Sequence, residues 1–296
     1  MKIVIGTRGS ELALWQARYT QTRLTSFGIE SELKIITTKG DAIQHLSFDK
    51  IEGKGFFTKE IEEALIAGEI DMAVHSLKDM PTSSVEGLML AGISERENPQ
   101  DWLIIKKESV DSSKVFGLKA GAVVGSSSAR RKAQLLHYRN DVMLNDIRGN
   151  VPTRLRKLEE GDFDAIMLAA AGLTRLNLDL SNFHVMQLNV REFIPAPAQG
   201  VLAWQVRKND QPLIDVARKL HSAKTLLTCN IERKVLKLIG GGCHIPLGVY
   251  CELDTMGHYH VWAAFQASPE QEVKFIRCSS TTSANLAEEV LAELGQ

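Results

Sequence analysis

Cys243 lies in a glycine-rich segment that reads GGGCHIPLG over residues 240–248. Three glycines before the thiol and Pro246 after it disfavour both a helix and a regular strand. We therefore expect this thiol on a loop, where it is available for chemistry. The alternative is a cluster of helix-capping glycines that carries an incidental cysteine. His244 follows directly, but adjacent residues seldom direct their side chains at each other, so a Cys–His pair is disfavoured.

A carboxylate, Asp79, follows a predicted buried strand at residues 71–77 and lies beside Lys78 and close to Pro81. At the end of a strand such a group can transfer a proton or stabilise a developing cation. The alternative is an Asx-type turn residue that only ends the strand. His75, on the strand itself, is better explained as a core histidine than as a catalyst.

Arginines gather at turns beside the predicted strand ends. They are Arg8, Arg130, Arg131, Arg148, Arg154 and Arg175. The guanidinium group keeps its charge and pairs bidentately with carboxylates. The pair that follows Ser128 opens a predicted helix, whose free N–H groups also favour an anion. Phosphate or nucleic acid would suit the same arginines, but the chain has no Walker motif and no interleaved aromatic residues. A polycarboxylate ligand is therefore favoured over isolated surface arginines.

The composition is that of a globular chain with two or three domains: 296 residues, 44% hydrophobic, with a formal net charge of −1. This charge provides no general basic field for nucleic acid, and no apolar run approaches the ~20 residues of a membrane span. The four cysteines show no CxxC spacing, so neither a metal site nor a disulfide framework is indicated. The N-terminus enters a strand pattern at once, without a secretory signal, and we expect a cytoplasmic protein.

Strands and helices alternate through the first two thirds of the chain, which is the pattern of parallel α/β sheets. Segments 68–74 and 161–167 echo each other, because in both a glycine and an acidic residue lead into an apolar strand. We therefore expect two similar α/β lobes of the periplasmic-binding-protein kind, with a ligand cleft at the carboxyl ends of their strands. A small α+β domain with a three-stranded antiparallel sheet should follow.

Proline-rich segments at 97–100 and 195–200 mark where the chain should leave the first lobe and return to it. They give the predicted domain boundaries. The first lobe, which carries Asp79, comprises residues 1–97 and 199–212. The arginine-rich second lobe comprises 98–198. The C-terminal domain, which carries Cys243, comprises 213–296 and begins with one helix that runs to Ile239.

Seven motifs match a known family in the same order along the chain. They are 5–16 (IGTRGSELALWQ), 53–57 (GKGFF), 73–81 (AVHSLKDMP), Arg130-Arg131, 148–151 (RGNV), 171–173 (AGL) and 241–243 (GGC). With these motifs the chain resembles the porphobilinogen deaminase family, also called hydroxymethylbilane synthases, over nearly its whole length. The resemblance implies a three-domain transferase of porphyrin and heme biosynthesis. Such an enzyme condenses four porphobilinogen molecules head to tail into hydroxymethylbilane and releases ammonia each time.

The resemblance also implies a role for each candidate residue. Cys243 would carry a dipyrromethane cofactor through a thioether. Asp79 would assist the loss of ammonia, stabilise the resulting azafulvenium cation and help to remove the proton after attack. Cofactor carboxylates would be held by Lys78, Ser128, Arg130, Arg131 and Arg148. Substrate would be held by Arg8, Ser10, Gln16, Lys54, Arg154 and Arg175. The family further implies a monomer that hands its product to a downstream tetrapyrrole cyclase.

Six positions depart from the family pattern that we expect. Gly240 and Gln205 stand where glutamate is usual, His244 where glutamine is, Ala198 and Pro152 where glycine is, and Ala129 where leucine is. None of them removes the thiol or a charged contact. Two alternatives remain open at this point: a two-lobed binding protein or sensor domain for a small organic anion, and a cysteine hydrolase. Only the deaminase predicts an intact mass raised by a covalent dipyrromethane.

Overall fold

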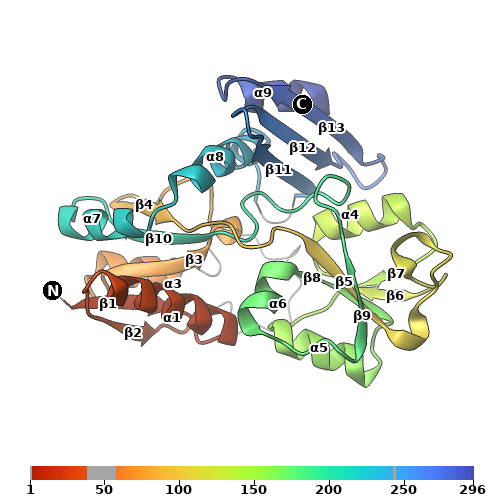
Figure 1. Ribbon diagram of the computed structural model, residues 1–296, viewed down its shortest axis with the longest axis horizontal. Helices are drawn as coiled ribbons and strands as arrows, with labels where there is room; N and C mark the ends of the chain where they lie inside the picture. Colours follow the sequence, from red (N-terminus) through yellow and green to blue (C-terminus); the bar gives the residue numbers. More distant parts are fainter. Residues whose placement is uncertain (1, 39–57, 243–244) are drawn as a thin grey trace. The chain divides into compact units, whose positions relative to one another are not determined.

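The computed structural model describes residues 2–38, 58–242 and 245–296. Lys54, Cys243 and His244, and the segment 39–57 whose mobility the sequence leaves open, therefore lie outside the described residues. The described chain divides into two compact units (Figure 1). The first contains the residues up to Glu97 together with Gly200–Leu227, and the second contains Asn98–Gln199 together with the residues from Thr228 onward.

The first unit is built on a five-stranded sheet in the order β2-β1-β3-β10-β4. Its strands are β1 (Ile3–Thr7), β2 (Ser31–Ile35), β3 (Met72–Ser76), β4 (Leu88–Ile93) and β10 (Leu202–Arg207). Strand β1 pairs in parallel with β2 and β3, whereas β10 runs antiparallel to both β3 and β4. The pattern of a parallel α/β sheet thus holds for β2, β1 and β3, and the fourth strand, β10, departs from it.

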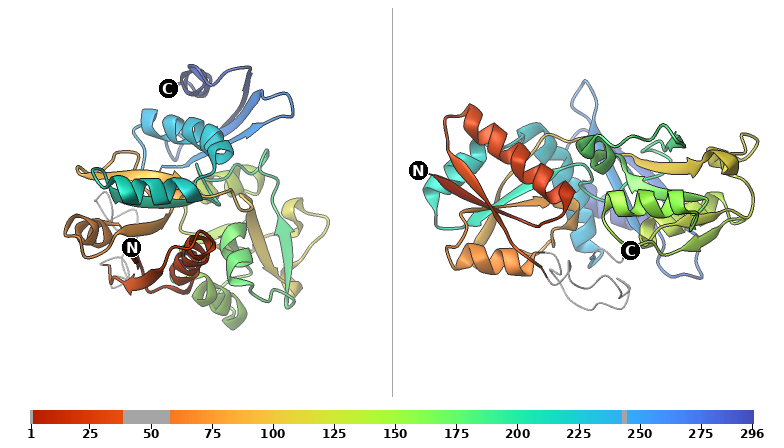
Figure 2. Two further views of the ribbon diagram at one scale, coloured as in Figure 1. Left: turned by 60° about the vertical axis from the view of Figure 1, so that its left-hand side comes forward. Right: turned by 90° about the horizontal axis from the view of Figure 1, so that it is seen from below.

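Helices cover both faces of this sheet. Helices α1 (Glu11–Ser26) and α7 (Gln211–Leu220) pack on one face, because their apolar residues share a core with β1, β3 and β10. Helix α3 (Lys59–Ile66) packs on the other face. The right-hand view of Figure 2 shows α1 in red and α3 in orange on opposite sides of the sheet. This layering places the first turn of α1 at the carboxyl ends of the strands.

The predicted boundary at residue 213 is wrong, and so is the single helix to Ile239. Two helices occupy this region, α7 and α8 (Ala223–Leu238), because His221 adopts an extended backbone between them. Leu213, Ala217 and Leu220 are buried in the core of the first sheet. Helix α7 therefore belongs to the first lobe and not to the C-terminal domain.

The second unit repeats the sheet pattern in the order β7-β6-β8-β5-β9. Its strands are β5 (Asp101–Lys106), β6 (Val123–Gly125), β7 (Met143–Asn145), β8 (Ala165–Ala169) and β9 (Phe183–Gln187). Strand β6 is parallel to β7 and β8, and β5 is antiparallel to β8 and β9. The prediction of two similar lobes is confirmed, since both sheets place an antiparallel strand fourth. In each lobe that strand is the first one after a proline-rich crossover.

Helix caps in the second unit set the positions of its arginines. Helix α4 (Ala129–Tyr138) begins after Ser128, whose side chain accepts a hydrogen bond from the backbone N–H of Arg131. Helix α5 (Val151–Glu160) begins after Asn150, and α6 (Ala170–Leu176) follows β8 directly. Helix α4 packs on one face of the sheet, and α5 and α6 pack on the other. Serine and asparagine are strong N-caps because their side-chain oxygens satisfy free N–H groups of the first turn.

The second unit ends in the expected three-stranded antiparallel sheet. Its strands β11 (Leu247–Leu253), β12 (Tyr259–Phe265) and β13 (Lys274–Ser280) pair in that order. Residues of α8 and of α9 (Leu286–Leu294) share a hydrophobic core with these strands. Among the described residues, no helix is both long and apolar enough to cross a membrane.

Candidate active site

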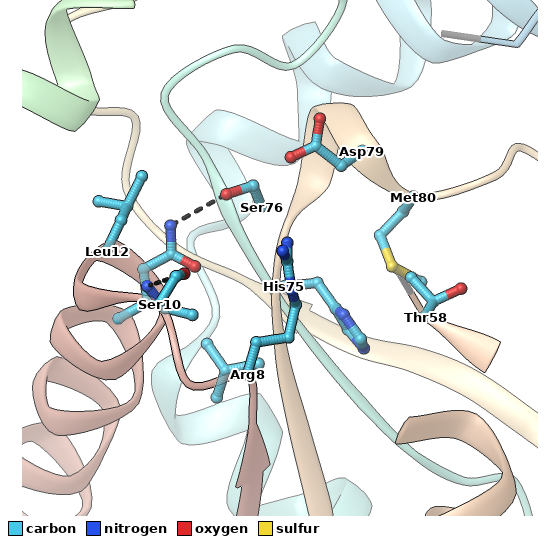
Figure 3. Close-up of a pocket in the computed structure, with 11 residues that line it drawn as sticks. Arg8, Ser10, Leu12, Thr58, His75, Ser76, Asp79 and Met80 are labelled. Carbon is cyan, nitrogen blue, oxygen red and sulfur yellow. Dashed lines mark hydrogen bonds between the residues drawn. The ribbon is translucent and has the colours of Figure 1, made fainter. Parts of the chain in front are cut away.

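A pocket opens in the first unit at the carboxyl ends of β1 and β3 (Figure 3). Its walls come from the turn after β1, the first turns of α1, the end of β3 and the turn that follows it. They are lined by Arg8, Ser10, Leu12, Ala13, Gln16, Thr58, Val74, His75, Ser76, Asp79 and Met80. The structure thus brings four of the predicted site residues, Arg8, Ser10, Gln16 and Asp79, into one pocket.

Ser10 and Gln16 are placed by helix α1. Ser10 is its N-cap, and the side chain accepts a hydrogen bond from the backbone N–H of Ala13 at 3.4 Å. The buried Gln16 donates from Nε2 to Oγ of Ser76 at 2.9 Å, which ties α1 to the end of β3 (Figure 3). Arg8 follows β1 directly and is half-buried. One cation and two polar side chains are therefore held on rigid elements at one end of the sheet.

Asp79 lies in a one-turn 3₁₀ helix, η2 (Leu77–Asp79), that follows β3. Leu77 and Met80 are buried and anchor this turn, while Asp79 is exposed. The carboxylate is therefore held on a short anchored turn and faces the pocket. Lys78, also predicted to bind, is half-buried and is not among the residues that line the pocket.

His75 joins the pocket to a buried polar chain. Its Nε2 lies 3.1 Å from Oε1 of Gln205, and Nε2 of Gln205 donates to Oε1 of Glu62 at 2.9 Å. Thr58 donates to the other oxygen of Glu62 at 3.1 Å. Burial, together with the nearby charge of Arg8, lowers the pKa of His75 to about 4. His75 is thus a neutral buried histidine, in agreement with the sequence interpretation, although it also forms part of the pocket wall.

The other predicted arginines lie in the second unit. Arg130 and Arg131 are buried in the first turn of α4, and both donate to Asp101. Nη1 of Arg130 lies 2.6 Å from Oδ2 of Asp101. Arg131 approaches Oδ1 with Nε at 3.0 Å and Nη2 at 2.7 Å. Both predicted cofactor ligands therefore already have one carboxylate partner within the protein.

Arg131, Arg148 and Arg154 form a cluster of like charges. Burial, then the charges of Arg131 and Arg148, lower the pKa of Arg154 to about 10. Nε of Arg154 donates to the backbone carbonyl of Gly149 at 2.8 Å, which orients the side chain from the start of α5. Cations that destabilise one another favour the binding of an anion. Arg175, on α6, is buried.

Two residues of this region, Asp101 and Gln199, are not among those predicted from the sequence. Asp101 is fully buried, and Nε2 of Gln199 donates to its Oδ1 at 3.0 Å. A signal was present: Asp101 opens the apolar strand Trp102–Ile105, and a carboxylate at such a place needs cationic partners. In the described part of the chain, no group of three His, Cys, Asp or Glu residues could hold a metal ion.

Two family models match the chain. "Porphobilinogen deaminase, dipyromethane cofactor binding domain" matches residues 3–215, and "Porphobilinogen deaminase, C-terminal domain" matches residues 226–295. The chain belongs to the porphobilinogen deaminase family. The resemblance found in the motifs is thereby confirmed, and a binding protein or sensor domain is not favoured.

Curated relatives agree with this assignment. A porphobilinogen deaminase of Nitratiruptor sp. is 46% identical over 253 residues, which cover 86% of this chain and 79% of the relative. One of Shouchella clausii is 47% identical over 251 residues, with 84% and 79% covered. A solved arginine-specific periplasmic binding protein of Salmonella typhimurium is 12% identical and covers 74% of this chain and 91% of its own, but its TM-score of 0.41 is too low to support an argument.

Proposed function

We propose that this chain is a hydroxymethylbilane synthase, which joins four porphobilinogen molecules head to tail and releases one ammonia for each. The observation that carries the proposal is the match of both deaminase family models, which together span residues 3–215 and 226–295. The pocket of the first unit, where Asp79 and Arg8 line one wall each, supplies the acid–base group and the cation that such a reaction needs.

The residues present fit a dipyrromethane cofactor, whose two pyrrole rings each carry an acetate and a propionate. Arg131, Arg148 and Arg154 are close enough for their charges to act on one another, and guanidinium groups are the preferred bidentate partners of carboxylates. We assign Lys78, Ser128, Arg130, Arg131 and Arg148 to the cofactor carboxylates, with Cys243 as the thioether attachment point. When bound, the cofactor supplies the pyrrole carbon to which the first substrate is added.

The pocket residues are assigned to the substrate. Arg8 would pair with a substrate carboxylate, while Ser10 and Gln16 offer further hydrogen bonds at the same end of the sheet. Lys54, Arg154 and Arg175 complete the set of substrate ligands that we propose. Each porphobilinogen carries two carboxylates, so the number of carboxylates that these cations must bind grows as the pyrrole chain is extended. This demand explains why a chain of net charge −1 concentrates arginines at a few turns.

Asp79 has two tasks in the reaction. The C–N bond of the substrate aminomethyl group breaks, the electron pair leaves with ammonia, and positive charge spreads over the pyrrole ring. A carboxylate stabilises that charge and accepts a hydrogen bond from the pyrrole N–H. After the new C–C bond has formed, the attacked carbon must lose its proton, and Asp79 can accept it. An exposed carboxylate on an anchored turn can reach the substrate without being locked into an ion pair of the fold.

The intact mass of the purified protein tests this function. We expect a mass above that of the 296-residue chain by one dipyrromethane, and an increase by further pyrrole units when porphobilinogen is added. Cys243→Ser should remove the extra mass, because a thiolate is a far better carbon nucleophile than a hydroxyl. Cys278→Ser is the matched control, since Cys278 lies on β13 and should leave the mass and turnover unchanged. A bare wild-type chain that releases no ammonia from porphobilinogen would refute the function.

Two further assignments belong to this proposal. We propose that the enzyme acts as a monomer in the cytoplasm, where the glutathione system keeps a thiol such as Cys243 reduced. The product, a linear tetrapyrrole with a reactive hydroxymethyl end, would pass to a cyclase that closes the ring. Sedimentation of the loaded enzyme at working concentration checks the first of these assignments.

A further inference from the structure

Asp101 is the centre of a fully buried polar cluster in the second unit. Its side chain has no exposed surface, yet it accepts hydrogen bonds from Arg130, Arg131 and Gln199. Burial by itself would raise the pKa of Asp101, but the charges of the two arginines outweigh burial and hold the pKa far below its ordinary value. The carboxylate is therefore ionised throughout the working pH range.

This carboxylate fixes the orientation of both guanidinium groups. Arg131 donates from Nε and Nη2 to Asp101 and from Nη1 to the carbonyl of Met167 at 3.0 Å. These three hydrogen bonds prevent the guanidinium plane from rotating. Arg130 uses Nη1 for both Asp101 and the carbonyl of Ile194, at 2.9 Å. A guanidinium has five N–H donors. Among the described residues, the hydrogen bonds of Arg130 leave Nε and Nη2 unused, so donors remain for a ligand.

The charge balance of the cluster explains why a carboxylate is needed here. Two buried cations side by side would repel each other and lose their hydration, at a cost of several kcal/mol per ion. Asp101 offsets one of the two charges. One positive charge remains, and it adds to those of Arg148 and Arg154, which act on one another with Arg131. The cluster is therefore stable enough to fold and still attracts an anion.

Gln199 is a further donor to the carboxylate, on the same oxygen, Oδ1, as Arg131. It lies in the crossover that returns from this lobe, and its Nε2 donates to the carbonyl of Pro99 at 2.8 Å as well as to Asp101. Pro99 lies in the outgoing crossover. Asp101 therefore cannot follow a rotation of either arginine, because it is held by a backbone segment that does not belong to helix α4.

We propose that Asp101 is a positioning residue for cofactor binding: it holds Arg130 and Arg131 in the one orientation in which their remaining N–H groups meet ligand carboxylates. The inference rests on the proposed function, because the ligand is the dipyrromethane polycarboxylate assigned above. Preorganised donors bind more tightly than mobile ones, since the cost of ordering them is met when the protein folds. Asp101 itself does not touch the ligand.

Asp101→Asn tests the proposal, because asparagine keeps the shape and one oxygen but turns N–H groups toward one of the guanidinium groups. We expect the fraction of folded protein that carries dipyrromethane, measured by intact mass, to fall at least tenfold. The matched control is Asp164→Asn. Asp164 is a half-buried carboxylate of the same unit that accepts from Ser109 at 2.7 Å and from the N–H of Val123 at 2.8 Å. This control should lower the melting temperature while the folded protein stays fully loaded.

Each outcome of these experiments distinguishes a positioning role of Asp101 from a merely structural one. Equal loss of cofactor in both variants would show a merely structural role and would overturn the proposal, as would full loading of folded Asp101→Asn. If Asp101→Asn does not fold, Asp101→Glu decides, because it keeps the ion pairs but shifts the carboxylate by one methylene. That variant should fold and load at least threefold more slowly when unloaded protein is given porphobilinogen, and loading at the wild-type rate would overturn the proposal. Absence of dipyrromethane from the wild type would refute the proposed function instead.

Discussion

Asp79 combines exposure with a fixed backbone. The η2 turn is anchored by two buried residues, Leu77 and Met80, so the carboxylate is presented to the pocket at a defined place. Such a group can bind a cation that develops on a ligand. A structural turn residue would need the side chain only to satisfy nearby N–H groups, and substitution by asparagine would then be harmless.

Asp79→Asn should lower turnover by a factor of about 10²–10⁴, because the amide cannot accept a proton or neutralise a cation. The fold and the attached dipyrromethane should be retained. Release of ammonia in a single turnover of already loaded protein measures this step apart from cofactor assembly. Glu86→Gln, an exposed carboxylate farther along the same chain segment, is the control and should keep the wild-type rate. Wild-type ammonia release by Asp79→Asn would reduce Asp79 to a turn residue.

His75 makes the stability of the first unit depend on pH. Its pKa is lowered to about 4, chiefly by burial, from about 6.5 in the unfolded chain. Between these two values the unfolded chain binds a proton that the folded chain does not, so the stabilising contribution is present above pH 6.5 and is lost as the pH falls toward 4. The loss amounts to about 2 kcal/mol at pH 5.

A comparison with His75→Gln measures this loss. Glutamine can still donate toward Gln205 but does not titrate, so the variant should lose about 2 kcal/mol less unfolding free energy than the wild type between pH 7 and pH 5. Urea unfolding at both pH values gives the two differences. Parallel losses in the two proteins would mean that His75 is charged in the folded state.

At the scale of elements, the start of α5 ties backbone conformation to the arginine cluster. Gly149 has φ +112°, which side-chain-bearing residues rarely adopt, and a Cβ at this position would lie 2.6 Å from Cγ2 of Thr153. The carbonyl of Gly149 also accepts the hydrogen bond from Nε of Arg154. A distortion of this turn should therefore weaken ligand binding together with the fold.

Gly149→Ala should destabilise the protein by roughly 2 kcal/mol or more, because left-handed strain adds to a collision with a β-branched side chain. It should also raise the KM for porphobilinogen, since Arg154 loses its orientation. Gly121→Ala is the matched control: its φ is +69°, but no atom of the described residues lies within 4 Å of an added Cβ. This control should cost about 1 kcal/mol and leave KM unchanged. Equal effects of the two substitutions on KM would contradict the coupling.

Local signals explain which elements could be predicted from the sequence. The start of helix α4 after Ser128 could be predicted because serine is a strong N-cap in front of an amphipathic run. The break between α7 and α8 carries neither glycine nor proline, and its one local signal is Ser222, whose side chain accepts a hydrogen bond from the N–H of Thr225 in the first turn of α8. The direction of β5 and β10 was also missed, because a strand that is buried on both faces has the same apolar pattern in either direction.

The residues of the candidate site also differ in how far the sequence could predict them. Arg8 and Asp79 were predicted from their places at strand ends, Ser10 and Gln16 only from the family resemblance, and the structure brings all four to one pocket. Asp101 carries the local signal of a carboxylate at the start of an apolar strand, but its pairing with arginines about 30 positions away has no local pattern. Distant pairing of this kind becomes visible only when the chain has folded.

For the whole molecule, the net charge of −1 means that no general positive field draws in a polyanionic ligand. Attraction must come from the local arginines. Exposed charges farther away than about 8–10 Å are largely screened at physiological salt. Changing exposed charges far from the pocket should therefore affect substrate binding little, whereas changing a charge in the pocket should affect it strongly. Both kinds of substitution change the net charge of the protein.

Reversal of two exposed lysines of the first unit, Lys208→Glu with Lys219→Glu, should leave the KM for porphobilinogen within about twofold of wild type, even though the protein becomes distinctly more acidic. Arg8→Gln changes the net charge much less but removes a charge-assisted hydrogen-bonding group, worth about 1.5–3 kcal/mol, from the pocket. Its KM should rise at least tenfold. Steady-state kinetics at about 0.15 M salt, which is roughly physiological, compare the three proteins. If the lysine variant raised KM as much as Arg8→Gln does, long-range charge rather than the pocket would govern substrate binding.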